Sequence, residues 1–463
     1  MTPVPRSHAI SHRQILTVCL PLMMSSAAVT VMEFTDRIFL THYSVEAISA
    51  ATPAGVTALL FIAFFSGVTG YAGVFIAQYT GAGADRRVGG VLWQALYFSI
   101  LSGLCFLALA GLAGPIFRLG GHSPDVQRLE IVYFRILCLG AVLHVAEIGL
   151  AGFFTGRGLT RPVMIVNILG MALNIPLDYA LINGFGPFPE LGIAGAGLAT
   201  VAAWLFMLLL YTVLIFRPGN DRRFAVWSAR RWDTALFGRL MRYGIPGSLQ
   251  FCLDICAFLF FIFMVGRIGK PALAATNIVI TVNALAFLPA LGFSQGVSML
   301  VGQALGRGDP DRARMAVRKA IQLLLGFIVL VDLLYLLAPE QVIGLFVPGG
   351  MPGTGYATIL ATAVRLLRVV AIYIFMDALY MIFAGALRGA GDTRFVMWSI
   401  GLASVVVMIG PTYLVVEVLK LDLMAAWICV LLFITCLFAI CGLRYRQGRW
   451  QSMRVVEAEV LSP

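Results

Sequence analysis

The sequence predicts an all-α, polytopic membrane protein whose twelve transmembrane helices form two pseudo-symmetric six-helix bundles. Three observations lead to this prediction. The chain is 60% hydrophobic and only 12% charged, with a mean hydropathy of +0.92, whereas soluble domains carry about 25% charged residues. Its apolar residues gather in twelve long stretches, and the landmarks of the first half recur in the second.

Each apolar stretch is long enough to cross a bilayer, since a spanning helix needs about 20 apolar residues. The predicted spans are 15–42, 48–79, 90–116, 128–154, 162–183, 191–216, 240–267, 272–304, 317–338, 359–386, 395–419 and 422–443. So little sequence lies outside them that we expect no soluble domain of ordinary size. The first stretch is too long for the apolar core of a signal peptide, so we expect it to be retained.

A repeat relates the two halves, with an offset of 225 residues that separates Pro21 from Pro246. The same offset pairs Gly67 with Gly292 and Gln78 with Gln303. We therefore expect an amino-terminal lobe at 1–216, a basic linker at 217–239 and a carboxy-terminal lobe at 240–463. With six spans each, the lobes would be parallel repeats that rock against each other. The glycine-rich loop at 347–355 has no partner in the first half.

The basic residues are unevenly placed along the chain. The net charge is +11, and 24 of the 33 basic residues fall at the two ends and on one alternating set of loops. This pattern follows the positive-inside rule and predicts that both termini are cytoplasmic. We expect a bacterial inner (plasma) membrane protein, a monomer surrounded by lipid, without a nucleic-acid partner. The eight cysteines lie in apolar segments without a CxxC pair, so they predict neither disulfides nor a metal site.

Acidic residues within the spans are the main functional signal, because an ionised carboxylate at mid-bilayer costs about 2.5 to 3.5 kcal/mol. Eight of the 22 acids are so placed: Glu33, Asp36, Glu147, Asp178, Asp254, Asp332, Asp377 and Glu417. Three of these acids have ordinary explanations. Glu33 faces Arg37 one turn away on a helix, and both Asp332 and Glu417 lie near the outer ends of their spans. Glu147 and His144 could either carry a proton together or make a polar contact between helices.

In the first lobe, oxygen-bearing residues of three spans fall at a similar depth. Asn174 and Asp178 stand four residues apart on one helical face, with Pro176 between them removing a backbone donor. Asp178 lies about 24 Å along its helix from the cytoplasmic end, and Asp36 and Thr200 reach a similar depth. Carboxylate and amide oxygens suit a small hard cation, and a carboxyl group can hold a proton. These four residues predict an ion or proton site.

The second lobe has a separate pair of acids. Asp254 and Asp377 both fall near the middle of the bilayer, and Tyr373 precedes Asp377 by one helical turn. The tyrosine could present its ring or its hydroxyl to a cation. The repeat offset maps Asp36 onto Phe261, so the acids of the two lobes arose independently. We therefore predict a second cation site in this lobe.

Several segments together resemble the multidrug and toxic compound extrusion (MATE) family over nearly the whole chain. They are EAISAA at 46–51, the QYTGAG and QALGRGD loops, NILGMALNIPLDYALI at 167–182, GIAGAGLAT at 192–200, GIPGSLQFCLD at 244–254 and MDALYMIFAGALRGAGDTR at 376–394. The resemblance implies cation-coupled export of amphipathic organic cations. It implies amino-lobe ion binding by Asp36, Asn174, Asp178 and Thr200, and carboxy-lobe binding by Asp254, Tyr373 and Asp377. Arg37 beside Asp36, and aspartate rather than glutamate at 254, depart from the family pattern.

We therefore expect an antiporter rather than an enzyme, with Na⁺ or H⁺ as the coupling ion and no other cofactor. No GxxxxGK[ST] motif is present, so the energy should come from an ion gradient. A flippase for lipid-linked oligosaccharides is the nearest alternative and would line its cleft with basic residues. An intramembrane aspartyl hydrolase is a more distant one. It would use GAGD at 389–392, but Asp392 falls in a loop and the chain has no Tyr-Asp dipeptide.

Overall fold

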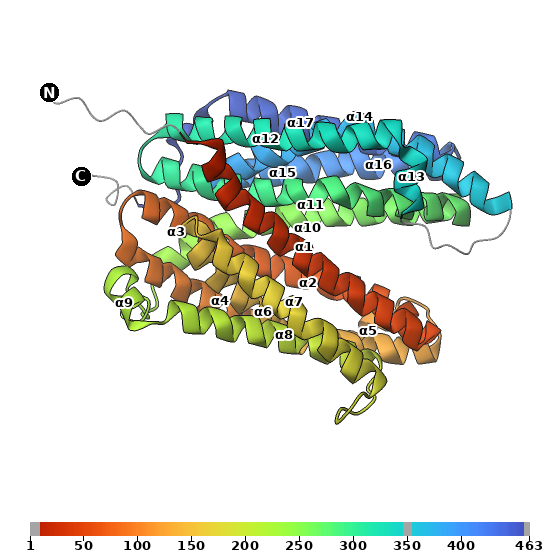
Figure 1. Ribbon diagram of the computed structural model, residues 1–463, viewed down its shortest axis with the longest axis horizontal. Helices are drawn as coiled ribbons and strands as arrows, with labels where there is room; N and C mark the ends of the chain where they lie inside the picture. The colour runs from red at the N-terminus through yellow and green to blue at the C-terminus, as the bar shows by residue number, and fades with distance from the viewer. Residues whose placement is uncertain (1–9, 346–353, 458–463) are drawn as a thin grey trace. The chain divides into compact units, whose positions relative to one another are not determined.

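The computed structural model describes residues 10–345 and 354–457. Within these residues the chain forms helices joined by loops and no strand (Figure 1). Twelve helical segments are long and apolar enough to cross a membrane. The predicted all-α fold with twelve spans is therefore confirmed. Residues 347–353 of the glycine-rich loop lie outside the described part of the chain.

The helices of the first half are α1 (His12–Tyr43), α2 (Val45–Gly70), α3 (Ala72–Gly81), η1 (Asp85–Arg87), α4 (Val88–Gly111), α5 (Ala113–Arg118), α6 (Pro124–Gly156), α7 (Thr160–Asn183), α8 (Ile193–Ile215) and α9 (Pro218–Phe224). Those of the second half are α10 (Thr234–Ile268), α11 (Lys270–Gly306), α12 (Pro310–Leu337), α13 (Pro339–Gly344), α14 (Thr354–Ala390), α15 (Thr393–Ala403), η2 (Ser404–Ile409), α16 (Gly410–Tyr413), η3 (Leu414–Val418), α17 (Leu423–Arg446) and η4 (Arg449–Ser452). The segments α2–α3 and α15–η3 each make one span.

The helices begin earlier at their basic ends than hydropathy predicts. Helix α12 starts at Pro310 rather than at residue 317. A helix needs only its backbone hydrogen bonds, so polar residues extend it beyond the apolar stretch. Asp309 fixes this start, because its carboxylate accepts a 2.8 Å hydrogen bond from the backbone N–H of Arg312. Proline at the first helical position also suits this start, because the backbone N–H that proline lacks would have no acceptor within the helix there.

Contacts between Cα atoms divide the chain into two units. The amino-terminal unit comprises Met24–Ser248, Gly306–Gly308 and the tail from Arg454. The carboxy-terminal unit comprises the chain up to Met23 together with Leu249–Leu305 and Asp309–Met453. The sequence placed the division in the linker at 217–239. By contact, the chain instead changes units within the long helices α1 and α10, on either side of Gly306–Gly308, and at the start of the tail.

Close packing explains the changes within α10 and α1. Ser248 of α10 donates hydrogen bonds to the carbonyls of Ala63 and Phe64 on α2, which holds the first half of α10 in the amino-terminal unit. Near the start of α1, Met23 packs against Gly292 of α11, where an added Cβ would lie 2.8 Å from the backbone nitrogen of Met23. A long helix can therefore have different partners at its two ends.

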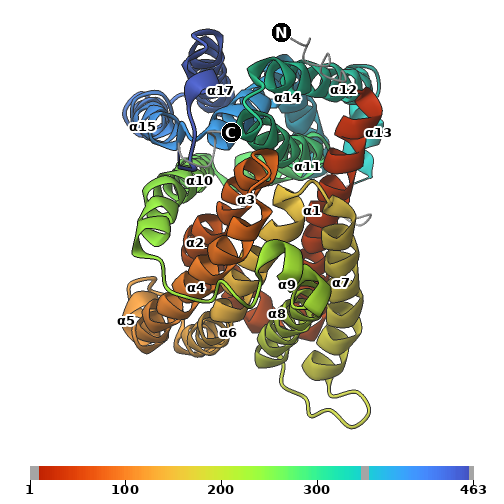
Figure 2. The same cartoon turned by 90° about the vertical axis from the view of Figure 1, so that its left-hand side faces the viewer.

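Helix α6 is the centre of the amino-terminal unit. Its most extensive contacts are with α2, α4 and α8. Figure 2 shows α6 between α4 and α8, with α7 beyond α8. A small residue also allows α6 to approach α3 closely, since a Cβ on Gly156 would lie 2.5 Å from the carbonyl oxygen of Gly73 on α3. The polar side chains that α6 bears are thereby placed in the interior of the unit.

Helix α14 has the corresponding place in the carboxy-terminal unit, where it packs against α17 and α12. It also approaches α11 closely, because Cβ atoms on Gly385 and Gly389 would lie 2.4 Å and 2.2 Å from the carbonyl oxygens of Ser294 and Ser298. The span that follows α15 contains two π-helical segments, η2 and η3. Pro411 lies between them and lacks the backbone donor of a regular helix.

The basic linker is docked on the amino-terminal unit. The indole nitrogen of Trp93 on α4 donates a 2.7 Å hydrogen bond to the carbonyl of Val226, just after α9. Gly89 lets the linker approach, because a Cβ there would lie 2.2 Å from the carbonyl oxygen of Ala225. The guanidinium of Arg157 lies 4.1 Å from the ring centre of Phe224. We call the end of this unit that carries α9 its basic end.

Large apolar side chains cover the outside of the helices. On α4, Ile100, Leu104 and Leu107 are 67%, 65% and 60% exposed and recur at helical spacing. Soluble proteins rarely expose contiguous apolar surfaces of this kind. The stripe therefore faces lipid, as the length and hydropathy of the helices predict.

Candidate functional site

Asp36 lies in the second half of α1 and only 7% of its surface is exposed. The hydroxyl of Thr200 on α8 donates a hydrogen bond to Asp36 Oδ2 at 3.3 Å. The same hydroxyl oxygen lies 3.1 Å from the carbonyl of Ala196, so a single proton is shared between two acceptors. Asp36 therefore retains the capacity to bind a further partner.

Asp178 and Asn174 lie on one face of α7, and both are fully buried. Pro176 stands between them and removes the backbone donor that would otherwise bond the carbonyl of Ala172. The carboxyl group of Asp178 lies within hydrogen-bonding reach of Asp36. Two ionised carboxylates repel each other, so this contact requires a proton on one of them or a cation between them.

Four buried oxygens of this group have no hydrogen-bond donor among the described residues. They are Asp36 Oδ1, Asn174 Oδ1, Asp178 Oδ1 and Asp178 Oδ2. A buried polar atom left without a partner costs roughly 1 to 3 kcal/mol of stability. The cluster therefore destabilises the fold unless a cation or a proton binds there. Carboxylate, amide and hydroxyl oxygens suit a hard cation, and a carboxyl pair can equally share one proton. The residues present therefore fit either Na⁺ or H⁺.

The structure brings all four residues predicted for the amino lobe together within one unit. Their role in ion binding stays a prediction. The direct pair expected between Glu33 and Arg37 is not formed among the described residues; Arg37 is exposed and acts on Glu33 and Asp36 only through longer-range electrostatics. Helical spacing allows such a pair but does not force two long side chains to meet.

Sequence reasoning missed Tyr133. This buried tyrosine of α6 lies within electrostatic range of both Asp36 and Asp178. It is distant from both acids in the sequence, and no local motif marks it. Only the packing of α6 in the centre of the unit brings its ring to the acids.

The carboxy-terminal unit gathers the three residues predicted for the second site. Asp254 of α10 and Asp377 of α14 interact electrostatically, and both are partly buried. Tyr373 is 4% exposed and interacts with Asp377. The direct partner of Asp254 is a residue that was not predicted, since Tyr380 donates a 3.1 Å hydrogen bond to Asp254 Oδ2. Tyr380 follows Asp377 by three residues, and this helical spacing could have identified it.

Two other acids have structural partners. Glu417 forms an ion pair of 2.7 Å with Arg267, which explains an acid near the end of its span. Asp392 binds Arg444 through both carboxylate oxygens, at 2.7 Å and 3.3 Å. Asp392 also stands at the start of α15. A carboxylate held in this bidentate pair is a structural element rather than a reactive acid.

Comparison with known proteins identifies the family. The MatE family model matches residues 21–180 and 246–414, which covers most of both halves. The chain belongs to the MATE family. It is therefore a multi-pass membrane transporter and not an enzyme, and the alternative of an intramembrane hydrolase is wrong.

Relatives of this MATE protein resemble it over most of their length. The multidrug resistance protein PmpM of Pseudomonas aeruginosa is 30% identical over 403 residues, 84% of this chain and 82% of PmpM. A probable multidrug resistance protein NorM of Thermotoga maritima is 26% identical over 452 residues, covering 96% of this chain and 95% of NorM. The crystal structure of a MATE protein in complex with MaL6 has a TM-score of 0.86 at 21% identity and matches 96% of this chain and 97% of its own, which shows the shared fold.

Proposed function

We propose that this MATE transporter is a secondary antiporter that exports amphipathic organic cations in exchange for Na⁺ or H⁺. The coupling ion binds at Asp36, Asn174, Asp178 and Thr200, and a second cation binds at Asp254, Tyr373 and Asp377. One observation above all supports the proposal. The buried carboxyl groups of Asp36 and Asp178 interact with each other, and three of their oxygens, together with Asn174 Oδ1, have no hydrogen-bond donor among the described residues, so a positive ion bound here would be stabilised.

The charge of the buried residues supports a cationic substrate. Among the described residues, the charged side chains that are buried are all acidic: Asp36, Glu130, Glu147, Asp178 and Asp392. A flippase that moves a lipid-linked phosphate needs positive charge along its path, because a buried phosphate is stabilised by Arg or Lys. Acids instead attract organic cations. The relatives PmpM and NorM are named multidrug resistance proteins, which also favours drug export here.

The placement of charge supports a bacterial inner-membrane location with both termini in the cytoplasm. The linker contains Arg217, Arg222, Arg223, Arg230 and Arg231, and it is docked at the basic end of the amino-terminal unit. Such clusters are retained on the cytoplasmic side during insertion. They also lie favourably against the anionic lipids of that leaflet.

The test is ethidium transport by the purified chain in proteoliposomes, with a Na⁺ gradient and a pH gradient imposed separately. One of the two gradients should drive ethidium against its own concentration gradient. Asp178→Asn should abolish this uphill movement, because the variant retains the size of the side chain but loses its charge. The matched control is Asp332→Asn, an in-span acid of α12 outside both candidate sites, which should transport at the wild-type rate.

Two results would refute the proposal. One is wild-type protein that moves ethidium under neither gradient. The other is full ion-driven transport by Asp178→Asn. Transport of a lipid-linked sugar phosphate by the same vesicles would favour the flippase instead.

A further inference from the structure

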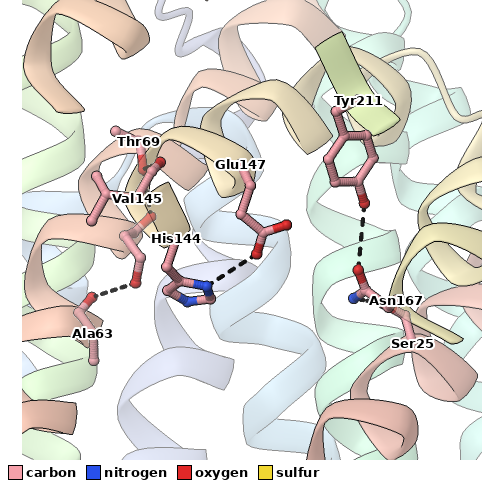
Figure 3. A network of polar contacts seen from close by, with 9 residues as sticks. Ser25, Ala63, Thr69, His144, Val145, Glu147, Asn167 and Tyr211 are labelled. Atoms are coloured by element: carbon pink, nitrogen blue, oxygen red, sulfur yellow. Dashed lines mark hydrogen bonds and ion pairs between the residues drawn. The ribbon is translucent and has the colours of Figure 1, made fainter. Parts of the chain in front are cut away.

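A second buried acid of the amino-terminal unit lies outside the site described above. Glu147 of α6 is 3% exposed, and its Oε1 lies 3.0 Å from Nδ1 of His144, three residues earlier on the same helix. Figure 3 shows the histidine ring directed at one carboxylate oxygen, with the other oxygen directed towards the side where Tyr211 and Asn167 lie. Because both partners belong to one helix, the pair does not join two helices.

Residues of two neighbouring helices face this pair. The ring centre of Trp204 on α8 lies 5.0 Å from that of His144, and the hydroxyl of Tyr211, also on α8, interacts electrostatically with Glu147. Glu33 of α1 interacts electrostatically with His144 and also with Asp36. Glu33, whose side chain is exposed, is therefore within electrostatic range of both groups of acids.

The remaining helices packed around α6 add no charge here. Helices α3 and α4 contain no Asp, Glu, Lys, Arg or His, and the charged residues of α2, α5 and α7 are Glu46, Arg118, Arg161 and Asp178. Glu46 and Arg161 lie in the first turns of their helices, and Arg118 ends α5. At this level α2 contributes the neutral hydroxyl of Thr69, which donates a 3.0 Å hydrogen bond to the carbonyl of Val145.

The pair lies nearer the basic end of the unit than the Asp36–Asp178 site. Helices α6 and α7 meet at this end, where α6 stops at Gly156 and α7 starts at Thr160. At 1.5 Å per residue, Glu147 lies about 14 Å from that end and Asp178 about 27 Å. On the side of Glu147 nearer the basic end, the hydroxyl of Tyr211 donates a hydrogen bond to Asn167 Oδ1 at 3.5 Å, and Asn167 Nδ2 donates one to Ser25 Oγ at 2.6 Å. A line of polar groups thus continues towards the basic end.

We propose that His144 and Glu147 form a second proton-binding site, through which protons pass between the Asp36–Asp178 pair and the basic end of the unit. The proposal rests on the antiport function proposed above and selects H⁺ as the ion that moves through this unit. Among side chains, only histidine in its ordinary state exchanges protons readily near neutral pH. His144 is the one histidine far from both ends of a spanning helix in the described part of the chain.

The proton transfer within the pair can be written with the residues named. A proton from the carboxyl pair reaches Nε2 of neutral His144 by way of Glu33, which gives an imidazolium ion. The proton on Nδ1 then passes to the carboxylate of Glu147, which lies 3.0 Å away, once the ring has turned into hydrogen-bonding alignment with it. The imidazole is left neutral in its other tautomer, so atoms and charge balance. A purely structural pair would bring little stability, since burying two charged groups costs about as much as their attraction returns.

The experiment measures ethidium transport by the reconstituted full chain under an imposed pH gradient, as a function of pH. We expect His144→Gln and Glu147→Gln to slow transport about 100-fold or more, as the loss of a positioned acid or base does, and to flatten its pH profile. Ethidium binding at equilibrium should be unchanged. The matched controls are His42→Gln at the end of α1 and Glu417→Gln, which should retain the wild-type rate and pH profile.

Glu147→Asp separates a proton carrier from a structural element, because this variant retains a carboxyl group. It should transport faster than Glu147→Gln. If Asp and Gln at this position are equally slow while both variants bind ethidium, the side chain has a packing role and the proposal fails. It fails also if both Gln variants transport like wild type.

The outcome for the wild type separates this inference from the proposed function. Transport driven by Na⁺ alone, without any response to the pH gradient, overturns the proton path and leaves the antiporter intact. Transport driven by neither gradient overturns both. Proton-driven transport that Asp178→Asn abolishes and His144→Gln does not affect overturns the inference alone.

Discussion

The hydroxyl of Tyr79 on α3 donates a 2.6 Å hydrogen bond to Oε2 of Glu457 in the carboxy-terminal tail. Arg239 of α10 forms an ion pair with the other carboxylate oxygen, and the backbone N–H of Val455 donates to Gln78 Oε1 at 2.9 Å. The tail is thereby held on the amino-terminal unit, although α17, which precedes it, belongs to the carboxy-terminal unit. The chain therefore passes from one unit to the other at the start of the tail, as it also does within α1 and α10.

This attachment should depend on pH. Burial raises the pKa of Glu457, but the hydrogen bonds from Arg239 and Tyr79 outweigh it and lower the pKa from 4.5 to about 2. Because the folded pKa is depressed, the stabilisation is complete above pH 4.5 and is lost as the pH falls from 4.5 to about 2. The Tm of Glu457→Gln should be lower than that of wild type at pH 6, and the difference should shrink below pH 4.5.

The control for this measurement is Glu340→Gln, an exposed acid of α13. It should match the wild type at every pH. A Tm difference between wild type and Glu457→Gln that grows on acidification would contradict the attachment.

Thr200→Val tests the amino-terminal ion site. The substitution preserves the shape of the side chain and removes the hydroxyl that bonds Asp36. One hydrogen bond contributes about 0.5 to 1.5 kcal/mol, so apparent ion affinity should change about two- to tenfold. It should weaken for Na⁺, which loses an oxygen ligand, and strengthen for H⁺, because the ionised carboxylate loses a donor. The ion concentration that gives half-maximal transport measures this, and Thr212→Val on the same helix is the neutral control.

Tyr380→Phe tests the carboxy-terminal site. The ring remains, and the hydrogen bond to Asp254 is lost. At about 1 kcal/mol for one hydrogen bond, ion-driven transport should fall about fivefold at sub-saturating ion concentration. Tyr445→Phe is the control, since the ring of Tyr445 stacks on Phe383 and Trp450 and would still do so. An unchanged ion dependence in Tyr380→Phe would remove this tyrosine from the site.

Gly389→Ala tests the packing of α14 on α11. The added methyl group would lie 2.2 Å from the carbonyl oxygen of Ser298, so the helices must separate. Overpacking of this kind costs about 1 to 3 kcal/mol, and the Tm in detergent should fall accordingly. At Gly326 of α12 nothing lies within 4 Å of an added Cβ, so Gly326→Ala should leave the Tm unchanged or raise it slightly. Equal Tm values for the two variants would show that the close approach is absent.

Much of the site could be predicted from the sequence because acids in apolar stretches are conspicuous. The spacing of Asp178 and Asn174 places them on one helical face, and in α7 both side chains are buried, as expected. The partner of Asp254 could not be predicted from the sequence. Tyr373 and Tyr380 both lie one turn from Asp377, and only the packing of α10 on α14 decides which hydroxyl reaches Asp254.

The sequence by itself determined the twelve spans, their two-fold repeat and the acids that cannot face lipid, because each follows from local hydropathy and from the cost of desolvating charge. The tertiary structure alone decided which groups meet. These groups are far apart in the chain. Asp36 interacts with Asp178, Tyr133 lies near both acids, Glu147 interacts with Tyr211, and the tail is bound to Tyr79. Hydropathy fixes the depth of a residue in the membrane. Its neighbours depend on how each helix is rotated and packed against the others, and the sequence of a single helix does not determine this.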